Sequence, residues 1–287
     1  MVSARLRRNA SFLFVIALLV VTAMFSGCSG QSRQDQAGTN HGSQVTGTIT
    51  VAGSTSVQPF SEVLAEAFMS KNPGVKVHVQ GGGSTQGIQA AISGAAEIGA
   101  SSRELKDQEK EAQLVETTMA LDGIAVVVHK DNPITELTRE EIKNIYLGNI
   151  TNWKALGGPP GDITVVCREE GSGTRGAFEE IVMDKEIITN KAIIQNSTGA
   201  VRTTVAGDPR GIGFVSLASL NEEVKAVKVD GVRPSLENVK NGSYKVARPF
   251  LYLTKGQPEG VVKAFIDFAL SSEGQQLLVE EGAISVK

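Results

Sequence analysis

One loop of the sequence carries the residue types that bind an oxyanion: Gly171-Ser172-Gly173-Thr174, with Arg168 just before it. Hydroxyls and a guanidinium donate hydrogen bonds, and glycines let backbone N–H groups approach a bound group closely. The β-branched run 163–167 predicts a buried strand before the loop, and the apolar spacing within 178–182 predicts a helix after it. Because the first N–H groups of a helix are unpaired and carry partial positive charge, the loop is a candidate site for a tetrahedral anion.

Two other interpretations of this loop stay open at this stage. Ser and Thr are also common in turns and at helix N-caps, whatever the function of the protein. The spacing of Gly171, Gly173 and Gly176 also fits the dinucleotide-binding fingerprint. That fingerprint requires an acidic residue about 20 positions later, where this chain has Ile193-Ile194-Gln195-Asn196. A P-loop requires a lysine, and the loop contains none.

The N-terminus predicts a secreted protein with a lipid anchor. Three arginines within residues 5–8 precede the apolar run 12–21, as in a secretory signal, and Cys28 follows Ser-Gly as at the cleavage site of a bacterial lipoprotein. We expect residues 1–27 to be a signal peptide, Cys28 to carry the lipid, and residues 28–46 to be a flexible tether. A secretory signal without lipidation, cut nearby, is the alternative.

Charge and cysteine content restrict the classes of function. Removal of the signal peptide lowers Lys plus Arg from 28 to 25 against 31 Asp plus Glu, so the formal charge moves from -3 to -6. A mildly acidic chain is not a general nucleic-acid binder. With Cys28 lipidated, Cys167 is the last thiol, so no intrachain disulfide can form and the fold depends on its core. We interpret Cys167 as a core residue.

The histidines do not indicate an enzyme. His41 lies in the tether, His78 in an alternating strand and His129 after an apolar one, so no serine has an evident His/Asp partner. No Cys/His/Asp cluster has the spacing of a metal site. The sequence therefore predicts a binding protein without cofactor or metal. A dinucleotide-binding enzyme that uses the loop at 171–176 and a purely structural surface lipoprotein are the alternatives.

The pattern of strand, small hydroxylated loop and helix occurs at three further places. The loops are Gly53-Ser54-Thr55-Ser56, Gly83-Ser84-Thr85 and Ser101-Ser102-Arg103. In parallel α/β sheets, ligands gather outside the carboxyl ends of the strands, where helix N-termini also meet. We therefore expect an α/β fold in which the four loops converge on one ligand.

These motifs resemble a known family. Gly53-Ser-Thr-Ser, Gly83-Ser-Thr, Ile98-Gly-Ala-Ser-Ser-Arg and Arg168-Glu-Glu-Gly-Ser-Gly-Thr-Arg, in this order, are similar to motifs of the phosphate-binding lipoproteins of bacterial phosphate ABC importers. The segments 132–153 and 211–217 are also similar, and the likeness runs from about Thr48 to the C-terminus.

The resemblance implies a fold and a function. It implies two α/β lobes of the type II periplasmic-binding-protein fold, with inorganic phosphate bound in the cleft between them and passed to ABC permease subunits. We expect lobe 1 to comprise 47–121 and 248–287 and lobe 2 to comprise 122–247, in a monomer held at the membrane by its lipid. A receptor for another tetrahedral oxyanion is the alternative within this class.

The resemblance also implies the ligand residues. They are Thr55, Ser56, Ser84 and Ser102 from one lobe and Arg168, Ser172, Gly173 and Thr174 from the other. Some relatives have an aspartate at the position of Ser102. We therefore expect Asp122, at the start of a buried strand, to accept the proton of the ligand, with Glu97 as the alternative. Arg103 and Arg175 are either exposed charges or members of ion pairs near the ligand.

Other segments carry local signals for the scaffold. Thr138 and Glu141 form a capping box that predicts a helix, and Trp153 is expected to pack beneath the Gly-Pro turn that follows. The apolar runs 121–129 and 246–253 are expected to cross between the lobes. The polar segment 104–113 is predicted to be helical.

Overall fold

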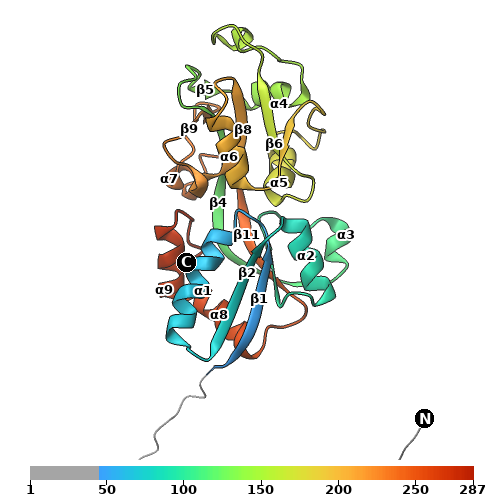
Figure 1. The fold of residues 1–287 in the computed structure, drawn as a ribbon, viewed down its shortest axis with the longest axis vertical. Coiled ribbons are helices and arrows are strands. Elements are labelled where there is room, and N and C mark those ends of the chain that lie inside the picture. Colours follow the sequence, from blue (N-terminus) through green and yellow to red (C-terminus); the bar gives the residue numbers. More distant parts are fainter. Residues whose placement is uncertain (1–44) are drawn as a thin grey trace, which may run out of the picture. The chain divides into compact units, whose positions relative to one another are not determined.

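One mixed β-sheet runs through the part of the chain that the computed structural model describes, residues 45–287 (Figure 1). The strands are β1 Gly47–Gly53, β2 Val75–Gly81, β3 Ile98–Ser101, β4 Val115–His129, β5 Glu136–Leu137, β6 Thr164–Arg168, β7 Ile193–Gln195, β8 Gly211–Ser216, β9 Val224–Ala226, β10 Lys228–Val229 and β11 Ala247–Thr254. Their order is β2-β1-β3-β11-β4-β8-β6-β7, β9 pairs with β4, and β5 pairs separately with β10. The predicted signal peptide and Cys28 lie outside the described residues.

Helices cover the sheet on both sides. They are α1 Gln58–Lys71, α2 Ser84–Ser93, α3 Asp107–Lys110, α4 Arg139–Leu147, α5 Gly173–Ile181, α6 Thr198–Ala206, α7 Leu236–Lys240, α8 Gly260–Ala269 and α9 Ser272–Glu280, with short 3-10 helices at η1 Trp153–Leu156 and η2 Leu217–Ser219. Within residues 45–287, none of these helices has the length and hydropathy needed to cross a membrane. The alternation of strands and helices confirms the predicted α/β class.

Strands β4 and β11 connect the two halves of the molecule. Residues 115–123 of β4 pair antiparallel with β11, and its later residues pair antiparallel with β8 and β9. Residues 124–128 are completely buried, as expected for a strand covered on both faces. Figure 1 shows β4 passing from the group of β1, β2, α1 and α8 to the group of β6, β8, α5 and α6. The crossing strand is longer than the predicted 121–129, because its first half also finds a partner in β11.

Separate hydrophobic cores stabilise the two halves. One core is built from residues within 49–120 and 250–283, where Phe60, Phe250 and Phe265 are almost fully buried. The other is built from residues within 124–246 together with Ile284. We call the half around the first core lobe 1 and the half around the second core lobe 2. Two separate cores are consistent with the predicted two lobes. The predicted lobe boundaries at 121/122 and 247/248 stay a prediction.

Most of the local signals for the scaffold give the expected elements. Thr138 and Glu141 form both hydrogen bonds of the capping box at α4. Trp153 is 1% exposed and its indole N–H donates to the carbonyl of Arg210. Cys167 is buried in the core of lobe 2, which confirms its predicted packing role.

The predicted helix over 104–113 is wrong in extent. Only α3, Asp107–Lys110, is helical, because Leu105 and Leu114 turn inward to a small core cluster of their own. A turn follows α3, in which the backbone N–H of Gln113 donates to the carbonyl of Lys110, and Gln113 has a positive φ of 52°.

Candidate functional site

The loops at the carboxyl ends of the parallel strands meet between the lobes. In lobe 1, β1 runs parallel to β2 and β3, so the loops after these strands lie at one edge of the sheet. In lobe 2, β6 runs parallel to β7 and β8, which brings the residues after these strands to the facing edge. The helices α1 and α2 begin at the first edge, and α5 and α6 begin at the second. The four predicted loops therefore converge, as expected.

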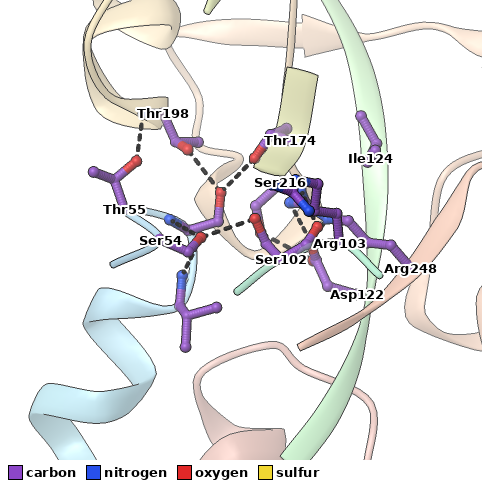
Figure 2. A network of polar contacts seen from close by, with 12 residues as sticks. Ser54, Thr55, Ser102, Arg103, Asp122, Ile124, Thr174, Thr198, Ser216 and Arg248 are labelled. Carbon is purple, nitrogen blue, oxygen red and sulfur yellow. Dashed lines mark hydrogen bonds and ion pairs between the residues drawn. The ribbon is translucent and has the colours of Figure 1, made fainter. Parts of the chain in front are cut away.

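The lobe 1 side of the site is a chain of buried hydroxyls. Ser54 Oγ donates to Ser102 Oγ at 2.8 Å (Figure 2). The backbone N–H of Ser102 donates to Ser84 Oγ at 3.0 Å. The three serines are at most 3% exposed. Gly53 allows this close packing, because its φ is 141° and a Cβ there would lie 2.2 Å from the carbonyl oxygen of Ala100.

The lobe 2 side of the site centres on Arg168, whose side chain is 1% exposed. Its Nε and Nη2 donate to the two carboxylate oxygens of Glu169 at 2.9 and 2.8 Å. Nη1 donates to Thr198 Oγ1 at 3.1 Å. Ser172 caps α5 by accepting from the backbone N–H of Arg175. Nε and Nη2 of Arg168 are therefore already occupied by Glu169. Nη1 is the nitrogen on the side of Thr198 and the converging loops.

Several hydrogen bonds join the lobes directly at the site. Ser56 Oγ of lobe 1 lies 2.8 Å from Thr174 Oγ1 and 2.8 Å from Thr198 Oγ1 of lobe 2. Figure 2 shows Thr174 and Thr198 on the same side of the site. The backbone N–H of Thr198 donates to Thr55 Oγ1 at 3.4 Å. A Cβ on Gly173 would lie only 2.1 Å from Ser84 Oγ. The structure is therefore a closed arrangement of the two lobes.

Asp122 is fully buried where the crossing strands meet. Arg248, its register partner on β11, donates from Nη2 to Asp122 Oδ2 at 2.9 Å, and Ser216 donates to Asp122 Oδ1 at 2.9 Å. Arg248 Nη1 also donates to the carbonyl of Ser102 at 3.1 Å (Figure 2). Burial raises the pKa of the Asp122 carboxyl above its ordinary value, and the charge of Arg248 opposes this shift. Both oxygens of the expected proton acceptor thus have protein partners.

The two other arginines near the site also form ion pairs. Arg103 Nη1 lies 2.6 Å from Glu109, and Arg175 Nε lies 2.7 Å from Glu179. Burial raises the pKa of Glu109, but hydrogen bonds from Arg103 and from the backbone of Lys106 outweigh it and hold the pKa below its ordinary value. Each of the four arginines at the site is therefore balanced by one carboxylate.

The predicted ligand residues lie together, and some neighbours were missed. Thr55, Ser56, Ser84, Ser102, Arg168, Ser172, Gly173 and Thr174 are all in the converging loops. Glu97 instead accepts from the backbone N–H of Thr50 at 2.7 Å, a structural contact. Thr198 was not predicted from the sequence, although Asn196-Ser197-Thr198-Gly199 follows a strand and precedes a helix as the other loops do. Ser54, Ser216 and Arg248 were not predicted either.

The fold and the site define a two-lobed α/β protein that encloses a small polar site between its lobes. A family model described as a PBP superfamily domain matches residues 38–273. The phosphate-binding protein PstS of Bacillus subtilis (strain 168) is 32% identical over 281 residues, covering 96% of this chain and 93% of that protein. The chain belongs to the PBP superfamily and, within it, to the family of the PstS phosphate-binding proteins.

Solved structures give the same family. One, named as a phosphate ABC transporter substrate-binding protein with bound phosphate from Clostridium perfringens, has a TM-score of 0.81 and 46% identity, covering 84% of this chain and 100% of that chain. An ABC-type phosphate transport receptor from Vibrio cholerae has a TM-score of 0.71 and 40% identity, covering 82% of this chain and 99% of the other.

Proposed function

We propose that this protein captures inorganic phosphate outside the cytoplasm and delivers it to the permease of an ABC transporter. The observation that carries the proposal is the closed site of buried hydroxyls around Arg168, in a chain 46% identical to a substrate-binding protein with bound phosphate. The relatives named above are phosphate-binding proteins or phosphate transport receptors, which supports the same ligand.

The proposed contacts with phosphate come from both lobes. Backbone N–H groups and hydroxyls of lobe 1 and lobe 2 donate to its oxygens, together with Arg168 Nη1. The proposed ligand residues are Thr55, Ser56, Ser84 and Ser102 from lobe 1 and Arg168, Ser172, Gly173 and Thr174 from lobe 2. Asp122 stays the proposed acceptor of the phosphate proton. Its oxygens already accept from Ser216, from Nε and Nη2 of Arg248 and from the backbone N–H of Ala218, so a bond from phosphate replaces one of these contacts. A ligand that contacts both lobes favours the closed arrangement over an open one.

We propose capture without a chemical step and without a cofactor. The hydroxyls of the converging loops have hydroxyl, backbone and arginine partners, none of which is a general base. Burial raises the pKa of the Cys167 thiol, which makes it a poor nucleophile. Binding and release are then the whole activity, and the protein acts as a monomer.

Calorimetry of the purified chain, stripped of bound anions, tests the proposed function. Phosphate is expected to bind with a stoichiometry of one, and sulfate and nicotinamide dinucleotides are expected to give no comparable heat. A chain that binds a dinucleotide but not phosphate would contradict the proposal. A chain that binds sulfate as well as phosphate would make it a general oxyanion receptor.

Gly173→Ala is expected to prevent full closure of the lobes. Its Cβ would lie 2.1 Å from Ser84 Oγ and 2.6 Å from Ser102 Oγ, so two buried side chains would have to move. Overpacking of this kind costs roughly 1–3 kcal/mol, so we expect phosphate affinity to fall about 5- to 150-fold. Small-angle scattering with saturating phosphate is expected to show a more open molecule than the parent.

Gly171→Ala is the matched control for this variant. A Cβ at Gly171 would meet Thr85 at 3.8 Å, an ordinary contact, so affinity should stay near that of the parent. Equal affinity of the Gly173→Ala variant and the parent would show that phosphate binds without the close contact of the two lobes.

Lipidation of Cys28 is proposed to hold the protein at the outer face of the cytoplasmic membrane, after removal of residues 1–27. Cys28→Ser is expected to release the mature protein from the membrane fraction, because the variant lacks the side chain that would carry the proposed lipid anchor. Fractionation and intact mass measure this. Unchanged membrane association together with unchanged mass would rule out the lipid anchor.

A further inference from the structure

Thr198 contacts both sides of the closed site. It is the first residue of α6 and is 2% exposed. Its Oγ1 accepts from Arg168 Nη1 at 3.1 Å and lies 2.8 Å from Ser56 Oγ of lobe 1. Its backbone N–H donates to Thr55 Oγ1 at 3.4 Å. One threonine therefore touches the arginine of lobe 2 and the hydroxylated loop of lobe 1.

The hydrogen bonds of Arg168 leave little freedom for its guanidinium. An arginine has five N–H donors, and four of them have protein partners here: Glu169 takes Nε and one on Nη2, Asn196 takes the other on Nη2, and Thr198 takes one on Nη1. The one remaining N–H is on Nη1, beside Thr198. Because the guanidinium is planar, Glu169 and Thr198 together set the direction of the free donor, and Thr198 is the partner on the nitrogen that carries it.

The hydroxyl of Thr198 is not needed to begin its helix. Ser197 is the N-cap of α6, and its Oγ accepts from the backbone N–H of Ala200 at 3.1 Å. Threonine hydroxyls in a buried position require partners, and the partners of Thr198 are Arg168 and Ser56 rather than α6 itself. A role in local helix stability therefore does not explain this side chain.

We propose that Thr198 is a positioning residue of the phosphate site, which aims the free N–H of Arg168 at the ligand and links that orientation to closure through Ser56. This inference rests on the proposed function. When the lobes separate, Ser56 leaves Thr198, and Arg168 loses the contact that holds its partner hydroxyl in place. The closed state consequently retains phosphate longer than a site in which Thr198 does not hold Nη1 of Arg168.

Thr198→Val tests the hydroxyl while keeping the shape of the side chain. Loss of a hydrogen bond to a charged group is expected to weaken phosphate binding about 10-fold or more. The change should lie mainly in a faster off-rate, because it destabilises the closed complex rather than the encounter. Stopped-flow release and calorimetry measure the two quantities. Thr198→Ser keeps the hydroxyl and should bind within about 2-fold of the parent.

Two controls separate positioning from packing. Thr203→Val makes the same substitution at an exposed position of α6 and should leave binding unchanged. In a Ser56→Ala background, Thr198→Val should lower phosphate affinity by a clearly smaller factor than it does in the parent, because the partner of Thr198 in the other lobe is already absent. Equal effects in the two backgrounds, or a Thr198→Ser variant as weak as Thr198→Val, would overturn the proposal.

The outcome also distinguishes this inference from the proposed function. A parent chain that does not bind phosphate contradicts the proposed function itself. A parent that binds phosphate, with a Thr198→Val variant of equal affinity and off-rate, contradicts only the role of Thr198. Thr198→Ala removes the same hydroxyl and replaces Thr198→Val if circular dichroism shows that the valine variant is unfolded.

Discussion

Arg168→Ala is expected to weaken phosphate binding by on the order of 3 kcal/mol or more, which is over 100-fold. The guanidinium is 1% exposed, so the proposed hydrogen bond to the anion would form without competition from water. The substitution also leaves the carboxylate of Glu169, which loses both of its contacts with Arg168, beside the incoming anion. The unpaired negative charge then repels phosphate, which adds to the loss of the donor.

Calorimetry on three variants checks this expectation. Arg210→Ala removes an arginine that is 59% exposed and outside the site, and should leave the affinity unchanged. Arg168→Lys keeps the charge but not the fork that holds Glu169, so its affinity should lie between those of the parent and Arg168→Ala. A loss smaller than about tenfold for Arg168→Ala, roughly 1.4 kcal/mol, would mean that the arginine does not contact phosphate.

Asp122→Asn is expected to lower the free energy of unfolding by about 3 kcal/mol. The carboxylate and Arg248 are both buried, at 0% and 1% exposure, and removal of one charge leaves the other without its partner in a place that water does not reach. Breaking a buried ion pair in this way commonly costs 3–5 kcal/mol. Replacing both partners, as in Asp122→Asn with Arg248→Met, should recover part of the loss because no lone charge remains buried.

Urea denaturation of these variants measures the effect, with an exposed ion pair as the control. Lys263 and Asp267 lie on α8 and are each 59% exposed, so Asp267→Asn should change stability by about 0.5 kcal/mol or less. If Asp122→Asn and Asp267→Asn lower the free energy of unfolding by similarly small amounts, the buried ion pair does not contribute strongly to stability. The same Asp122→Asn protein also reports on the proton acceptor, since an amide can donate as well as accept and should raise the affinity for sulfate relative to phosphate.

The sequence by itself determined the local pieces of this site. Apolar runs and helical spacing place Gly171-Ser172-Gly173-Thr174 between β6 and α5, and the same pattern places the loops at Ser56, Ser84 and Ser102. These elements can be predicted from the sequence because periodicity, helix caps and turn glycines depend on residues only a few positions apart. The loop before α6 carries the same pattern, so a place for Thr198 at the site could have been predicted in the same way.

Only the tertiary structure decided which side chains face one another. Asp122 meets Arg248 across 126 residues because β4 and β11 pair in one register, and a shift by one residue would turn the two side chains to opposite faces. Ser56 meets Thr174 and Thr198 across 118 and 142 residues because the lobes close. These contacts depend on strand register and on the packing of two separate cores, which no local pattern encodes, and they set the charge balance and the geometry of the site.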